Sequence, residues 1–194
     1  IDFSIPEAAE QVTRSCQQQK LPLVMATTGL DDQQGQLLQE AGKEIPIVWA
    51  PNMSLAVNLA MKLAVMAAEV LKQVPAGVDV DIIEQHHRYK KDAPSGTALR
   101  FGQLIAGVMG QSRHVHGREG ITGERSQDEI GYHALRVGDH PGEHTIVFGM
   151  PGEILELTVR ASSRDSYALG ALQAAKFVVD QSPGIYSMDD VLGL

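Results

Sequence analysis

Residues 21–52, LPLVMATTGLDDQQGQLLQEAGKEIPIVWAPN, decide the fold class. Short apolar runs at 21–26 and 45–49 flank a predicted helix at 31–41, which ends at Gly42. An apolar run of this length between turn residues is typical of a strand that is buried on both faces. Strands that alternate with helices predict a parallel α/β layer.

The pattern continues towards the amino terminus and ends after residue 53. Pro6 favours the start of a further helix, and Ser54 can cap a long helix over 55–74, whose apolar residues recur at helical spacing. Residues 1–53 are therefore predicted to be the later part of a Rossmann-like sheet. The chain opens on Ile1, which is not a natural initiator, and we expect an upstream part of the domain to be missing.

The second half has a different order of elements. A strand over 78–87 leads through a polar loop into a helix over 97–109. Strands at 130–137, 143–150 and 154–162 are joined by short turns, which predicts an antiparallel meander.

We expect an α+β domain over 54–163 with a mostly antiparallel sheet, and a final helix from Asp165. A sheet of few strands has a face that needs cover, either from a helix of the same chain or by self-association. Residues 111–129 are polar without periodicity, and His114 and His116 within them are expected on the surface.

Composition restricts the partners. Hydrophobic residues make up 43% of the 194, which is ordinary for a folded protein. A formal net charge of -8 offers no general attraction to nucleic acid or an anionic membrane, so an anionic ligand needs local positive charge. A single cysteine, Cys16, excludes an intramolecular disulfide and fits a reducing cytoplasm. No segment approaches the roughly 20 apolar residues that span a bilayer.

The densest polar cluster is EQHHRYKKDAPSGTA, residues 84–98. It joins the end of a predicted strand to the start of a predicted helix. The amides of Ser95, Gly96 and Thr97 would point outward there, where the helix dipole favours a carboxylate or phosphate. The sequence therefore predicts an anion pocket with a titratable lysine and histidine beside it.

Simpler roles remain open for parts of this cluster. Arg88 and Lys91 fit solvated surface charges, and Ser95 can be a helix cap alone. His86 and His87 can be hydrogen-bonded residues at a strand end. Adjacent histidines on a strand point to opposite faces, and no carboxylate stands at HExxH spacing, so we expect no metal site.

The cluster resembles the signature of the 4-hydroxy-tetrahydrodipicolinate reductase family, E-x-H-H-x-x-K-x-D-x-P-S-G-T-A, at every fixed position. The motif is long and specific, and the resemblance extends over essentially the whole chain. Other stretches in family order are IDFSIP at 1–6, ATTG at 26–29, APNMS at 50–54, REG and TGER within 118–125, GD at 138–139, GEHT at 142–145 and ASSR at 161–164.

The resemblance implies a reductase of bacterial lysine and diaminopimelate synthesis that uses NADH or NADPH. His86 matches the family's catalytic donor/acceptor and Lys90 its proton donor. His87, Gly96 and Thr97 match contacts with the carboxylates of a dicarboxylate substrate. The positions that match contacts with the nicotinamide half of the cofactor are Ala26, Thr27, Thr28, Ala50, Pro51, Asn52 and Met53.

The resemblance also implies that residues 164–194 return to the first domain and that the second domain builds a homotetramer. Two positions depart from the family: Ala26 stands where glycine is usual, and Tyr167 where phenylalanine is usual. The phosphate loop and the residue that reads the ribose would lie upstream of Ile1, so the preference between NADH and NADPH cannot be predicted.

The chemistry agrees with these roles. Hydride addition to an unsaturated imine builds negative charge on the ring, and a nearby protonated lysine or histidine can quench it by general acid catalysis. Two alternatives remain. A dicarboxylate-binding oligomer without hydride transfer would share the pocket, and a reductase of another imine or aldehyde would have to account for the whole signature.

Overall fold

The computed structural model describes all residues, 1–194, and the chain divides into two compact units. The first unit comprises Ile1–Leu59 and Asp165–Leu194, and the second comprises Ala60–Arg164. Helix α3 (Leu55–Leu71) carries the chain from the first unit into the second. No helix is both long and apolar enough to cross a membrane.

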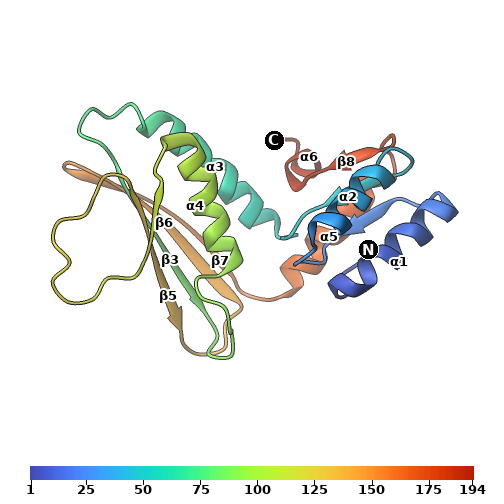
Figure 1. Ribbon diagram of the computed structural model, residues 1–194, viewed down its shortest axis with the longest axis horizontal. Coiled ribbons are helices and arrows are strands. Elements are labelled where there is room, and N and C mark those ends of the chain that lie inside the picture. Colours follow the sequence, from blue (N-terminus) through green and yellow to red (C-terminus); the bar gives the residue numbers. More distant parts are fainter. The chain divides into compact units, whose positions relative to one another are not determined.

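The first unit is a parallel sheet packed between helices (Figure 1). Its strands are, in order, β1 (Leu23–Met25), β2 (Pro46–Trp49) and β8 (Gly184–Tyr186). Asp2 adds a parallel bridge to Met25 of β1. The helices are α1 (Pro6–Gln19), α2 (Asp32–Ala41), α5 (Asp165–Val178) and α6 (Met188–Leu192).

Alternate residues of these strands face opposite sides of the sheet. Leu23, Met25 and Ile47 belong to a buried cluster with residues of α1 and α2. Val24 and Val48 belong to a second cluster with residues of α5 and α6. Burial on both faces explains why the strands are continuous apolar runs rather than alternating ones.

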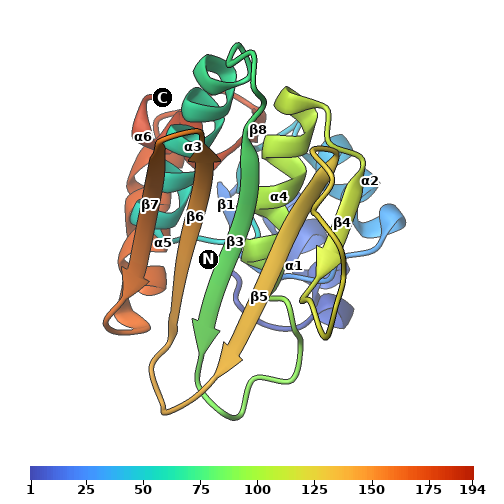
Figure 2. The ribbon, with the colours of Figure 1, turned by 90° about the vertical axis from the view of Figure 1, so that its left-hand side faces the viewer.

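The second unit is a mixed sheet with α4 (Gly96–Met109) against one face. Figure 2 shows the sheet face on, with α4 behind it and no helix on the face towards the viewer. The strand order is β4 (Arg113–His116), β5 (Glu129–Arg136), β3 (Asp79–His86), β6 (Gly142–Met150) and β7 (Glu153–Ala161). Neighbours pair in parallel from β4 to β3 and antiparallel from β3 to β7.

The predicted fold class is confirmed, but the predicted meander is correct only for β6 and β7. β3 lies between β5 and β6, so the two strands on either side of the turn at Gly138 do not pair. The connection crosses the end of β3 and bonds to the backbone there, through Val137 N to His86 O at 3.0 Å and Arg88 N to Gly138 O at 3.1 Å.

Three short elements were not predicted: β4 in the polar segment 111–129, and β8 and α6 near the carboxyl terminus. The two strands are held by pairing with β5 and β2, and neither has an apolar pattern of its own. His114 and His116 are exposed, as expected. Both rings stack on Tyr132, with centroids 5.6 and 5.1 Å away.

Helix α3 begins as predicted, with Val57 N donating to Ser54 Oγ at 3.3 Å. The periodic apolar residues do not all face a core, however. Met66 and Val70 are 55% and 70% exposed, whereas Ala64 and Ala68 are buried. Small residues on the buried side allow close packing of the helix and leave the larger side chains outside.

Candidate active site

The family-like cluster begins on the buried face of β3. Every second residue of this strand, namely Val80, Ile82, Glu84 and His86, is buried towards α4. The first two are ordinary core residues, and the last two place a carboxylate and an imidazole at the same face near the strand end. Burial of such groups is favourable only with hydrogen-bond partners.

Glu84 accepts hydrogen bonds at both carboxylate oxygens, and its side chain is fully buried. Oε2 contacts Nδ1 of His86 at 2.6 Å and accepts from Arg136 at 2.8 Å. Oε1 accepts from the amide of Ser95 at 3.0 Å and from Arg136 at 2.7 Å. One carboxylate therefore connects the end of β3, the strand β5 and the start of α4.

The charge states follow from these contacts. Burial acts to raise the pKa of Glu84, but hydrogen bonds from Arg136, His86 and Ser95 outweigh it and hold this pKa below its usual range. Burial lowers the pKa of His86 despite the opposing effect of Glu84. Since an ionised carboxylate only accepts, the neutral imidazole of His86 carries its proton on Nδ1. Its Nε2 is then left as an acceptor.

A second histidine lies beside the first. His144 of β6 is 5.2 Å from His86 between ring centroids, edge to face, and its Nε2 is 2.9 Å from Ser95 Oγ. Burial lowers the pKa of His144 to about 4. His144 is thus neutral at physiological pH and serves as a polar packing partner for Ser95.

The amino terminus of α4 is the predicted anion site. Ser95 caps it, with Oγ accepting from the amide of Ala98 at 3.1 Å. Gly96 is exposed, and a Cβ at this position would meet no atom within 4 Å. The space in front of the first helical turn is therefore open to a ligand, and the helix dipole favours an anion there.

Lys90 is a half-buried cation in the loop between β3 and α4. Its Nζ donates to Oδ1 of Asp92 at 2.8 Å, and this bond lowers the pKa of Asp92. The carbonyl of Asp92 in turn accepts from Arg136 at 2.6 Å. The charge of Lys90 is close enough to His86 to help depress the pKa of that histidine. Arg88 and Lys91 are exposed, as expected for solvated charges.

His87 points away from this network. Its Nε2 lies 3.3 Å from the guanidinium of Arg164, the last residue of the second unit. Its Nδ1 is buried without a hydrogen-bond partner. Since a guanidinium only donates, Nε2 of His87 is the acceptor in this contact, and Arg164 provides the local positive charge for a carboxylate.

The positions matched to cofactor contacts lie at one edge of the first unit. Ala26, Thr27 and Thr28 follow β1, whereas Ala50, Pro51, Asn52 and Met53 follow β2. Parallel neighbours end at the same edge, and the carboxyl ends of strands are where open α/β sheets bind nucleotides.

Contacts with other residues of the first unit hold the loops at this edge in place. Thr27 is buried and donates to Asp2 at 2.8 Å, while Thr28 and Pro51 are exposed. A Cβ at Gly170 of α5 would lie 1.7 Å from the carbonyl oxygen of Met53, so α5 packs directly on that loop.

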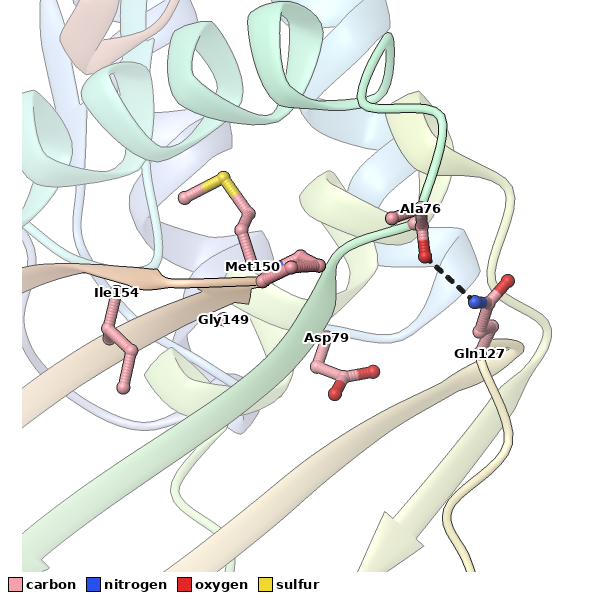
Figure 3. Close-up of a pocket in the computed structure, with 8 residues that line it drawn as sticks. Ala76, Asp79, Gln127, Gly149, Met150 and Ile154 are labelled. Atoms are coloured by element: carbon pink, nitrogen blue, oxygen red, sulfur yellow. Dashed lines mark hydrogen bonds between the residues drawn. The ribbon is translucent and has the colours of Figure 1, made fainter.

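A hollow of about 320 Å³ lies at the opposite end of β3 (Figure 3). Its walls include Asp79, Met150 and Ile154, and Gln127 bonds to the carbonyl of Ala76 at 3.0 Å. A wall with a carboxylate and without a lysine, arginine or histidine does not suit a dicarboxylate. No group of three or more His, Cys, Asp or Glu side chains is placed to hold a metal ion.

Sequence analysis assigned no role to Arg136 or His144, and His144 appeared only within the family-like stretch at 142–145. Arg136 and His144 reach the cluster from positions 52 and 49 residues along the chain. The only available signal was a glutamate on a strand that is otherwise apolar on its inner face, since a buried carboxylate needs a cation.

Comparison with known proteins places the chain in a family. The family models described as dihydrodipicolinate reductase, N-terminus and C-terminus, match residues 1–53 and 56–192. A 4-hydroxy-tetrahydrodipicolinate reductase of Rhodopirellula baltica is 62% identical over 100% of this chain and 70% of its own length. That of Pseudoalteromonas atlantica is 51% identical over 100% of this chain and 73% of its own.

A solved structure supports the same assignment. The dipicolinate-bound dihydrodipicolinate reductase from Paenisporosarcina sp. TG-14 matches with a TM-score of 0.77 at 30% identity. The match covers 97% of this chain and 71% of that one.

Proposed function

The chain belongs to the dihydrodipicolinate reductase family, and we propose that it reduces 4-hydroxy-tetrahydrodipicolinate to tetrahydrodipicolinate in diaminopimelate and lysine synthesis. We infer that it is an NAD(P)H-dependent oxidoreductase, because its curated relatives are named 4-hydroxy-tetrahydrodipicolinate reductases. The observation that carries the proposal is the shared hydrogen-bond network of Glu84, His86 and Ser95, which places an imidazole next to an open helix terminus.

Substrate binding is assigned to His87, Gly96 and Thr97. The open terminus of α4 would take one carboxylate through the amides of Gly96 and Thr97, with the helix dipole behind them. His87 would contact a carboxylate beside Arg164, whose guanidinium, at 3.3 Å from Nε2 of His87, would add positive charge. The relative from Paenisporosarcina was solved with dipicolinate, a planar dicarboxylate, which supports this ligand class.

Proton transfer is assigned to Lys90 and His86. The conversion takes up a hydride and a proton and releases the 4-hydroxyl group of the substrate as water. Lys90, held at 2.8 Å by Asp92, is the group that can give the proton. His86 presents Nε2 as an acceptor, so it can orient or receive a proton at the same centre. Burial, helped by the positive charges of Lys90 and Arg136, lowers the pKa of His86 and favours its neutral form.

A reduced nicotinamide supplies the hydride when it is bound. We assign its contacts to Ala26, Thr27, Thr28, Ala50, Pro51, Asn52 and Met53. Short loops at the carboxyl edge of β1 and β2, with Thr28 and Pro51 exposed, fit such a group. Either NADH or NADPH is compatible with these residues.

We further propose a homotetramer and a cytoplasmic location. The sheet face opposite α4 carries no helix and includes exposed Ile83, Leu135 and Ile154, which a second sheet could cover. A single cysteine is typical of proteins from reducing compartments. Light scattering and cell fractionation test the two statements.

The decisive experiment is an assay of NADH and NADPH oxidation with freshly generated 4-hydroxy-tetrahydrodipicolinate. Turnover that depends on this substrate is expected. Binding of pyridine-2,6-dicarboxylate without turnover or nucleotide binding would instead support a dicarboxylate-binding oligomer. Turnover with a different imine or aldehyde alone would show another reductase.

A further inference from the structure

We infer that Glu84, clamped by Arg136, is a positioning residue that fixes the proton of His86 on Nδ1 and holds the start of α4 at the same time. The inference deepens the proposed function and rests on it. Glu84 itself touches no reacting atom in this assignment, because its four hydrogen-bond partners surround it inside the protein.

The clamp is geometric. Arg136 spans both oxygens of Glu84 at 2.8 and 2.7 Å, the two-pronged arrangement in which a guanidinium and a carboxylate fix each other's orientation. A third donor contact reaches the carbonyl of Asp92 at 2.6 Å. The same arginine therefore also holds the residue whose carboxylate binds Lys90.

The carboxylate decides which nitrogen of His86 is free. The amide of Ser95 and the two nitrogens of Arg136 can only donate, and the ionised carboxylate of Glu84 can only accept. Nδ1 of His86, at 2.6 Å from Oε2, must therefore bear hydrogen. Nε2 is then an acceptor on the far side of the ring. If the proton were on Nε2 instead, the imidazole would stay in place, but Nε2 would be a donor rather than an acceptor.

The glutamine variant separates these effects. In Glu84→Gln, the amide NH₂ must face either the backbone amide of Ser95 or Nδ1 of His86. In both orientations it also meets one N–H of Arg136, so the guanidinium keeps one of its two bonds and turns away from the other. The backbone amide cannot stop donating, whereas His86 can move its proton to Nε2 and accept at Nδ1. We therefore expect the proton of His86 to change nitrogen while the start of α4 stays in place.

The test uses the full-length protein and compares wild type with Glu84→Gln. We expect kcat to fall about a hundredfold, the scale of a lost proton-transfer contribution. We also expect KM and the affinity for pyridine-2,6-dicarboxylate to change less than about threefold, since the binding groups keep their positions. Imidazole ¹⁵N shifts should report Nδ1–H in wild type and Nε2–H in the variant.

Glu129→Gln is the matched control. Glu129 is also a buried carboxylate, 4% exposed, and accepts from Arg118 at 2.6 Å, but it lies away from the signature. This variant should lower the melting temperature without altering kcat or the proton of His86. A purely structural role of Glu84 would make the two variants behave alike.

Each outcome is decisive. If the wild type is active and Glu84→Gln keeps both full turnover and the proton of His86 on Nδ1, the inference is overturned and the proposed function stays intact. An inactive wild type overturns the proposed function, and the ¹⁵N shifts still decide the position of the proton. If Glu84→Gln is insoluble, Arg136→Lys replaces it: a fall in kcat of about tenfold supports the clamp, and an unchanged kcat overturns it.

Discussion

The α-carbon of Gly142 lies directly against the imidazole of His86, so that a Cβ there would be 2.6 Å from Nε2. No side chain fits in this gap unless the ring moves. The first residue of β6 is thus part of the wall that sets the position of the proposed catalytic histidine.

Gly142→Ala should therefore displace His86 and lower kcat by about tenfold to a hundredfold, because misplacement by about 1 Å is costly in catalysis. Steady-state kinetics measure the effect. Gly149→Ala, on the same strand, is the control, since its Cβ would meet Asp79 at an ordinary 3.7 Å. Equal kinetics for the two variants would contradict the steric role of Gly142.

Lys90→Ala should reduce kcat by about a hundredfold or more, because the proposed proton donor is removed. Its melting temperature should change little, since the side chain is only half-buried and its partner Asp92 is solvent-accessible. Lys91→Ala removes a neighbouring exposed charge and should retain activity. Unchanged turnover in Lys90→Ala would remove this lysine from the mechanism.

Protein stability should fall as the pH drops from about 6.5 towards 4. The pKa of His144 is lowered to about 4 in the folded protein, so the unfolded chain binds the proton more readily across that interval. The full stabilisation is present above pH about 6.5, and its loss amounts to roughly 3 kcal/mol for this residue.

Urea unfolding at several pH values measures this dependence. His144→Gln removes the titrating group and should make the slope of unfolding free energy against pH shallower. A remaining slope is expected because burial lowers the pKa of His86 in the same direction. Identical slopes in wild type and variant would exclude His144 as the source.

Gly102→Ala should destabilise the second unit by about 1–3 kcal/mol through overpacking. Its Cβ would lie 1.8 Å from Oη of Tyr132, a buried group that also bonds to His114 at 2.7 Å. Tyr132→Phe added to this variant should recover part of the loss. Gly107→Ala on the same helix meets no atom within 4 Å and should be neutral or stabilising in thermal unfolding.

Local patterns were sufficient for much of the fold. The apolar runs at 21–26 and 45–49 predicted β1 and β2 because strands buried on both faces leave a continuous signal. Short elements such as β4 and β8 left none, since pairing with a neighbour stabilises them rather than their own composition. Sequence patterns likewise predicted α3 but not which of its apolar residues would be exposed.

The sequence by itself determined the order of the longer strands and helices, without β4, β8 and α6. It also determined the single stretch, residues 84–98, in which the candidate chemistry is concentrated. Only the tertiary structure decided that β3 separates β5 from β6 and that Arg136 and His144 join Glu84 and Ser95. The reason is that hydrophobic periodicity and turn residues determine local structure, because each acts over only a few positions of the chain. The partners of a buried charge come from whichever strands pair beside it, here about fifty residues away.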